Sequence, residues 1–96
     1  MVIKSNSSKK VQLSTPNNHL QLKEAVEAAL MGDWDKSHKI AQDYSDPMAN
    51  WIHAVLHKIE GDEWNSRYWY ARSGCKSYED FADPNEELRR ILTELN

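Results

Sequence analysis

The sequence predicts an all-α fold, a small antiparallel bundle of helical hairpins with four longer helices plus a short one. Apolar residues recur at helical spacing from residue 16 onward, and no stretch alternates in the manner of a β-strand. Short connections that contain Gly-Asp separate the apolar stretches, which makes successive helices antiparallel neighbours. With 96 residues and 40% apolar content, the chain has room for one hydrophobic core.

The N-terminal segment has a different composition. Residues 1–15 are rich in Ser, Asn and Lys and contain few large apolar side chains. Ordering such a segment would cost more conformational entropy than burial returns. We therefore expect a flexible N-terminal tail over residues 1–15 and a single α-helical domain over residues 16–96.

The first hairpin is predicted from its helix ends and its apolar stripes. A first helix begins either at Thr15-Pro16 or at Asn17-Asn18, and it ends at Gly32. Its buried positions are Leu22, Ala25, Val26, Ala29 and Leu30. Asp33 has the side chain of an N-cap, and the helix that it starts continues to Ser45. The stripe of this second helix consists of Trp34, Ser37, His38, Ala41 and Tyr44.

The second hairpin has the clearest pattern in the chain. Asp46 and Pro47 form a helix start, because Pro at the first helical position lacks the amide that would otherwise need a partner. The apolar face of this third helix consists of Met48, Trp51, Ile52, Val55, Leu56 and Ile59. Gly61 ends it and Asp62 caps a fourth helix, which runs from Glu63 to about Arg72. The buried stripe expected on the fourth helix is Trp64, Tyr68 and Ala71, so Trp51 and Trp64 are predicted core residues.

The C-terminal part completes the bundle. Ser77 and Asp80 can cap a short turn. Asp83, Pro84 and Glu86 then form the start of a final helix. Its apolar side consists of Leu88, Ile91, Leu92 and Leu95.

Composition disfavours several classes of function. The net charge of −3 leaves no basic stripe for nucleic acid or for an anionic membrane, and no apolar run approaches the roughly 18 residues of a membrane span. The single cysteine, Cys75, allows neither an internal disulfide nor a thiolate zinc site, and we expect a cytoplasmic protein. No nucleophile motif or glycine-rich phosphate loop indicates an enzyme.

The two hairpins repeat with a period of about thirty residues, between Gly32-Asp33 and Gly61-Asp62. This spacing resembles that of a degenerate tetratricopeptide unit. The residues at its small-residue positions are Ala25, Ala28, Ala54 and Ser66. The Trp-x-x-Leu-Gly and Tyr hallmarks of that repeat are missing, and His57 stands where an aromatic residue is expected.

Residues 30–74 also resemble an uncharacterised group of small, mainly bacterial helical proteins. The shared pattern is Gly32-Asp33, His38, Gln42, Trp51, His53, His57, Glu60-Gly61-Asp62, Asn65 and Tyr68-Trp69-Tyr70-x-Arg72. The departures are Ser37 and Ser66 in place of Ala and Lys58 in place of Arg. The resemblance implies no particular activity, but it implies that these polar and aromatic positions belong together.

The chemistry in this pattern centres on histidine. His53, His57 and Glu60 fall at i, i+4 and i+7 on one side of the third helix, and His38 would add a third imidazole if the second helix packs beside them. Such a set of nitrogens and an oxygen suits a divalent metal such as zinc. Ala54 stands where a zincin would need its Glu.

Two functions remain open from the sequence. The first is a protein-interaction module, in which a groove lined by aromatic and His side chains takes up another chain or mediates self-association. The second is a metal- or small-ligand-binding protein centred on the histidines. In either case the His residues could also serve as interhelical hydrogen-bonding groups. The candidate ligand-binding residues are His38, His53, His57, Glu60, Asn65, Trp69, Tyr70 and Arg72.

Overall fold

The structure, a computed structural model, describes residues 18–96, which form helices and no β-strand. The elements are α1 (His19–Leu30), α2 (Trp34–Ala41), α3 (Pro47–Ile59), α4 (Glu63–Tyr70), the short 3-10 helix η3 (Tyr78–Asp80) and α5 (Pro84–Leu95). The predicted all-α fold is confirmed. The tail predicted over residues 1–15 lies outside the described residues.

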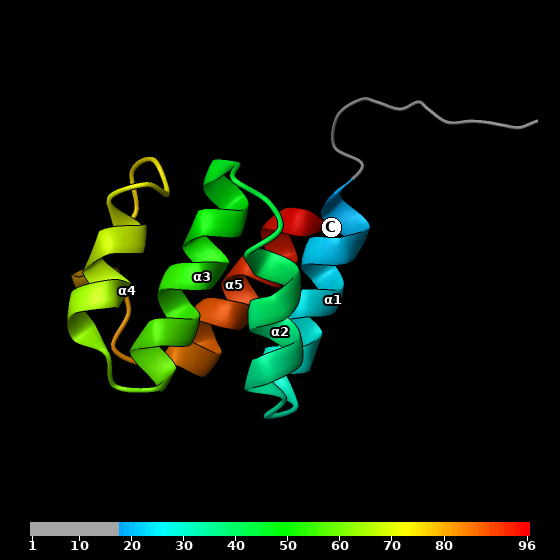
Figure 1. The fold of residues 1–96 in the computed structure, drawn as a ribbon, viewed down its shortest axis with the longest axis horizontal. Helices are drawn as coiled ribbons and strands as arrows, with labels where there is room; N and C mark the ends of the chain where they lie inside the picture. Colours follow the sequence, from blue (N-terminus) through cyan, green and yellow to red (C-terminus); the bar gives the residue numbers. More distant parts are fainter. Residues whose placement is uncertain (1–17) are drawn as a thin grey trace, which may run out of the picture.

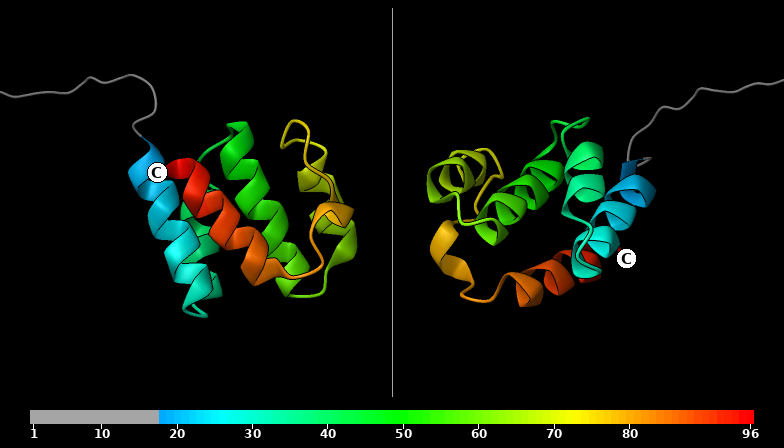
Figure 2. Two further views of the ribbon diagram at one scale, coloured as in Figure 1. Left: turned by 180° about the vertical axis from the view of Figure 1, so that it is seen from behind. Right: turned by 60° about the horizontal axis from the view of Figure 1, so that its bottom comes forward.

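Two helical hairpins, α1–α2 and α3–α4, lie side by side, and α5 crosses behind them (Figure 1). The view from behind in Figure 2 shows α5 lying between α1 and α3, with its C-terminal end close to the start of α1. Because α3 contacts α1, α2, α4 and α5, it is the central helix. For this reason every residue of α3 from Ala49 to Leu56 is buried, including the polar Asn50 and His53.

The two Gly-Asp turns have the same geometry. Gly32 and Gly61 adopt left-handed φ angles of 85° and 83°, which favour glycine. The amides of Asp33 and Asp62 donate to the helix carbonyls five residues earlier at 2.8 and 2.9 Å. Each Asp carboxylate then accepts the amide three residues later and so caps the next helix. The turns therefore set both hairpins, and they place α2 and α4 on either side of α3 (Figure 1).

The prediction that Trp64 is a core residue is wrong, because α4 packs through its opposite side. The fully buried Ser66 donates its hydroxyl to the carbonyl of Ala54 at 2.7 Å, and its small side chain lets α4 approach α3 closely. Trp64 lies two residues before Ser66, about 200° around the helix, and is 75% exposed. Tyr68 shares that outer side, whereas Tyr70 shares the inner side with Ser66.

Three smaller expectations also need correction. Ile59, the last residue of α3, is 41% exposed at the point where the chain turns toward α4. The second helix ends at Ala41 and not at Ser45, because the amides of Asp43 and Tyr44 bond to carbonyls three residues earlier and tighten the chain. In the same way α4 ends at Tyr70 and not at Arg72.

None of the described helices is long and apolar enough to cross a membrane.

Candidate functional site

Three histidines from two helices meet at one point. His53 and His57 lie one turn apart on α3, and α2 packs against that side and adds His38. One ring nitrogen from each residue lies within 4.8 Å of the other two. Nε2 of His38 and Nε2 of His53 lie 3.0 Å apart. The structure thus brings together the three imidazoles that sequence spacing selected.

Two tryptophans hold two of these rings in place. Trp34 stacks on His38, with ring centroids 4.7 Å apart and planes 9° apart. Trp69 stacks on His53 at 4.0 Å and 11°. Trp34 is itself fixed, because its indole nitrogen donates to the carbonyl of Leu56 at 2.7 Å. Trp34 is absent from the predicted site, although its i, i+4 spacing to His38 on one helix could have indicated it.

Glu60 contacts the third imidazole. Its Oε1 lies 2.7 Å from Nδ1 of His57 at the C-terminal end of α3. Asp62 also lies close to these two residues, but its oxygens accept the backbone amide and side-chain amide of Asn65 at 3.2 and 2.6 Å. These two hydrogen bonds lower the pKa of Asp62. Asp62 and Asn65 are therefore engaged in capping α4.

The surroundings keep two of the imidazoles neutral. Burial, together with the neighbouring His38 and His57, lowers the pKa of His53 to about 4. Burial also lowers the pKa of His38, and Glu60 and Asp35 oppose this effect in part. His53 is 6% exposed. Near neutral pH, His38 and His53 are thus uncharged rings that share one proton between their Nε2 atoms. Loss of this shared proton or its move to Nδ1 would leave both Nε2 lone pairs to bind a cation.

Two other predicted site residues lie elsewhere. Tyr70 is 3% exposed, and its hydroxyl donates to Glu87 at 2.6 Å. The guanidinium of Arg72 lies 3.8 Å from the ring centre of Tyr68 and donates to the carbonyl of that residue. With Trp69 stacked flat on His53, the structure supports a filled cluster of rings more than an open groove.

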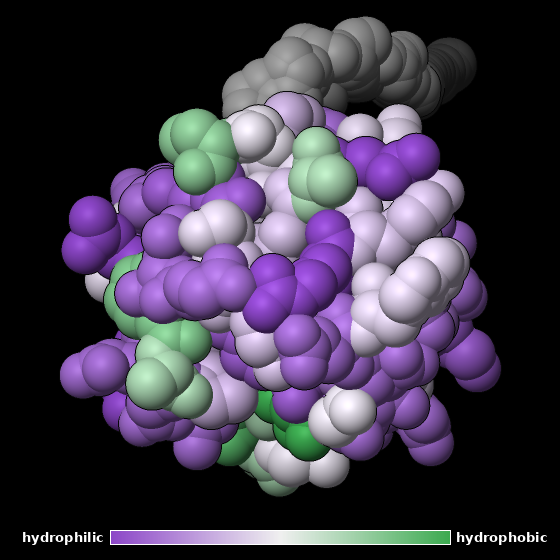
Figure 3. Space-filling model, turned by 90° about the vertical axis from the view of Figure 1, so that its left-hand side faces the viewer, coloured by the Kyte–Doolittle hydropathy of each residue, from purple (hydrophilic) through white to green (hydrophobic). Residues whose placement is uncertain are grey.

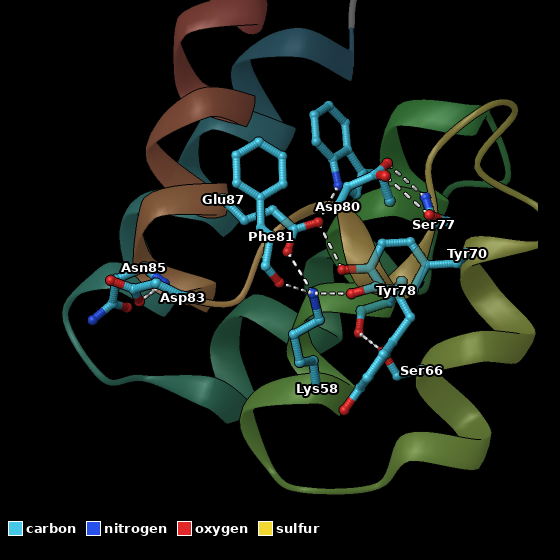
Figure 4. A network of polar contacts seen from close by, with 12 residues as sticks. Lys58, Ser66, Tyr70, Ser77, Tyr78, Asp80, Phe81, Asp83, Asn85 and Glu87 are labelled. Carbon is cyan, nitrogen blue, oxygen red and sulfur yellow. Dashed lines mark hydrogen bonds and ion pairs between the residues drawn. The ribbon is translucent and has the colours of Figure 1, made fainter.

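A second polar cluster, absent from the sequence prediction, joins α3, α4 and α5 (Figure 4). The ammonium of Lys58 donates to the fully buried Glu87 at 2.9 Å. It also donates to the backbone carbonyls of Tyr78 and Phe81 at 3.0 Å. Trp51 donates to the other carboxylate oxygen of Glu87 at 2.7 Å, beside the Tyr70 hydroxyl. Since every strong donor and acceptor here has a partner, this cluster fastens the C-terminal part to the hairpins.

The hollow beside η3 is a weaker candidate for a binding site. It is lined by Lys58, Arg67, Tyr78, Glu79, Phe81, Ala82 and Pro84. Both of its cations already have carboxylate partners, because Lys58 pairs with Glu87 and Arg67 with two glutamates. The histidine cluster is therefore the candidate site that the geometry favours.

Comparison with protein-family models, with curated proteins and with solved structures gives no match for this chain. The two resemblances noted from the sequence therefore remain predictions.

Proposed function

We propose that this protein binds a divalent transition-metal ion through His38, His53 and His57. The observation that carries the proposal is the convergence of three imidazole nitrogens from α2 and α3 within 4.8 Å. A set of three imidazoles favours zinc, copper, nickel or cobalt over magnesium or calcium, which prefer oxygen ligands. Three protein ligands also leave a fourth position for water or another small ligand.

The spacing of the Nε2 atoms of His38 and His53 supports this proposal. With zinc–nitrogen distances of about 2.0–2.1 Å, two ligands of a tetrahedral ion lie about 3.3 Å apart. The Nε2 atoms of His38 and His53 are 3.0 Å apart, close to that separation. The same two atoms can share a proton in a hydrogen bond when no ion is present. Since the three ring nitrogens lie within 4.8 Å of one another, binding would then need a small ring movement.

The cluster is held in place before any ion binds. Trp34 and Trp69 stack on two of the rings, and Glu60 bonds to the third. Rings already held in position lose little conformational freedom when they bind a ligand. The carboxylates of Glu60 and Asp35 act electrostatically on His38 and favour positive charge at this point. Both features are those of a cation site.

The test is a titration of the metal-free, untagged protein with Co²⁺ or Zn²⁺. We expect one ion per chain, and we expect His53→Ala to weaken binding by at least about 100-fold, since loss of a ligand exceeds the usual effect of an outer-shell partner. The matched control is His19→Ala, which removes the one remaining histidine of the four, exposed on α1. That variant should bind as tightly as the original chain.

Two results would contradict the proposal. One is that the original chain binds no stoichiometric metal near neutral pH, at metal concentrations that saturate a known three-histidine site. The other is equal weakening by His19→Ala and His53→Ala, which would show non-specific binding to imidazoles. Circular dichroism of each variant would separate a lost ligand from a lost fold.

A second candidate function is docking of a protein partner or of a second copy on the outer side of α4. The rings of Trp64 and Tyr68 stack there with centroids 6.1 Å apart, and Trp64 is largely exposed. Exposed tryptophan and tyrosine are typical anchors of protein interfaces. Figure 3 shows that hydrophilic residues cover most of the α4 side and that strongly hydrophobic residues form only small separate groups. The two aromatic rings are therefore the feature that favours docking.

For self-association, we expect Trp64→Ser to shift sedimentation toward the monomer by removing the large anchor. The fold should be kept, because this side chain is exposed. The control is Leu20→Ser, which replaces another exposed apolar residue, on α1. A monomer for the original chain at high concentration, or equal effects of the two substitutions, would count against self-association through α4.

A further inference from the structure

We infer that Glu60 is a positioning residue of this metal site: it fixes the proton of His57 on Nδ1 and so presents Nε2 of that ring to the ion. The inference rests on the proposed function, because it assigns a role within the same site. It concerns a residue that the sequence placed among direct ligands.

The hydrogen bond itself sets the direction of the proton. An ionised carboxylate only accepts hydrogen bonds, so at 2.7 Å the Nδ1 of His57 must donate to Oε1 of Glu60. A neutral imidazole has one protonated nitrogen and one lone pair. With the proton on Nδ1, the lone pair of His57 lies on Nε2, where it is available for a metal. A carboxylate bonded to the outer nitrogen also makes such a ligand more basic.

The backbone at the end of α3 places Glu60 beside the His57 ring. Glu60 is the C-cap of α3, and its amide donates to the carbonyl of Leu56. The left-handed Gly61 follows, and the amide of Asp62 donates to the carbonyl of His57 at 2.9 Å. The helix end thus holds both the carboxylate and the imidazole at a separation of three residues. The end of α3 therefore keeps the Glu60 side chain, which is 42% exposed, within reach of the His57 ring.

The neighbouring carboxylate does not compete for this role. Both oxygens of Asp62 accept hydrogen bonds from Asn65. Glu60 is therefore the carboxylate whose hydrogen bond selects the His57 tautomer, and Asp62 serves the start of α4. An outer-shell partner of this kind usually contributes 10–100-fold to metal affinity.

The first measurement needs no metal. Long-range ¹H–¹⁵N correlation spectra at mildly alkaline pH distinguish the two neutral tautomers of each histidine ring. We expect His57 to carry its proton on Nδ1 in the original chain and to gain the Nε2-protonated form in Glu60→Ala. Glu60→Gln keeps a carbonyl acceptor and should fall between the two. Glu63→Gln, a change at an exposed glutamate paired with Arg67, is the matched control and should leave His57 unchanged.

The second measurement is Co²⁺ affinity in the same four proteins. We expect about a 10–100-fold loss for Glu60→Ala, a smaller loss for Glu60→Gln and none for Glu63→Gln. The visible absorption spectrum of the Co²⁺ complex should keep its shape in all four, because the three nitrogen ligands are unchanged. An affinity loss with an unchanged spectrum shows that the ligand set is intact. A purely structural disruption of the site would change both the affinity and the spectrum.

The outcomes separate the two proposals. An unchanged His57 tautomer in Glu60→Ala, or a changed Co²⁺ spectrum in Glu60→Gln, would overturn the positioning role, the latter by making Glu60 a direct ligand. The expected tautomers without any Co²⁺ binding would support the role of Glu60 in orienting His57 and would refute the metal site. The expected tautomers with graded affinity support both.

Discussion

Replacing Lys58 with Met should destabilise the fold by about 3–5 kcal/mol, because it leaves the Glu87 carboxylate buried without its cation. The Lys58 ammonium lies 2.9 Å from this carboxylate, and the two side chains are 7% and 0% exposed. The substitution also leaves the carbonyls of Tyr78 and Phe81 without their donor. Since small domains have a total stability of about 5–15 kcal/mol, such a loss would bring this one close to unfolding.

The measurement is urea unfolding followed by circular dichroism. Lys36→Met is the matched control, because Lys36 also pairs with a glutamate, Glu24, at 3.3 Å but on the surface, with side chains 52% and 56% exposed. Surface pairs contribute about 0–1 kcal/mol, so this control should stay within that range. The difference between the stability losses of Lys58→Met and Lys36→Met therefore measures the effect of burying the ion pair, because both variants lose a lysine.

A double substitution shows whether the buried charge is the cause. In the Lys58→Met background, Glu87→Gln removes the uncompensated charge and keeps an acceptor for Trp51 and Tyr70. We expect this second change to recover part of the lost stability. Equal losses for Lys58→Met and Lys36→Met, or a further loss on adding Glu87→Gln, would refute the role assigned to the pair.

The helix ends set by Asp-Pro and Gly-Asp could be predicted from the sequence because their causes are local, whereas the C-terminal ends of α2 and α4 were predicted too late. Asp46 with Pro47, and Gly61 with Asp62, act on amides and carbonyls within five residues, and α3 and α4 begin where these residues predict. The buried side of α4 is different. Hydrophobicity favoured Trp64, but close approach to α3 favours the small Ser66, and this depends on the facing helix. Periodicity within one helix contains no such information, whereas the repeat of about thirty residues had already placed Ser66 at a small-residue position.

The histidines of the candidate site could also be predicted from local spacing and short turns. His53 and His57 share a side of α3 through their spacing alone, and short turns made α2 the neighbour that could add His38.

The buried ion pair of the second polar cluster could not be predicted in this way. Lys58 and Glu87 gave no such signal, because the two residues are 29 positions apart and charges are expected at the surface. The position of Glu87 directly before Leu88, within the apolar side of α5, was the available hint.

The second large predicted effect is a loss of folding stability in acid, caused by the lowered pKa of His53. Its pKa is lowered from 6.5 to about 4 in the folded protein, where the rings of His38, His57 and Trp69 surround it. Between these two pH values the unfolded chain binds a proton that the folded chain does not. Stability from this group is therefore complete above pH 6.5, falls as the pH decreases and levels off below about 4. At about 1.36 kcal/mol per pH unit, the loss amounts to at most about 3.4 kcal/mol.

Unfolding in urea across this pH range, with a chelator present to remove metal, measures the effect. His53→Gln keeps a polar group but cannot take up the proton, so its stability should fall less steeply with acid than that of the original chain. His19→Gln is the matched control, since His19 is exposed on α1, and it should follow the original chain. Carboxylates contribute to acid unfolding in all three proteins, and the difference between the two variants removes that shared part. Parallel pH profiles for His53→Gln and His19→Gln would mean that His53 takes up its proton as readily in the folded state as in the unfolded one.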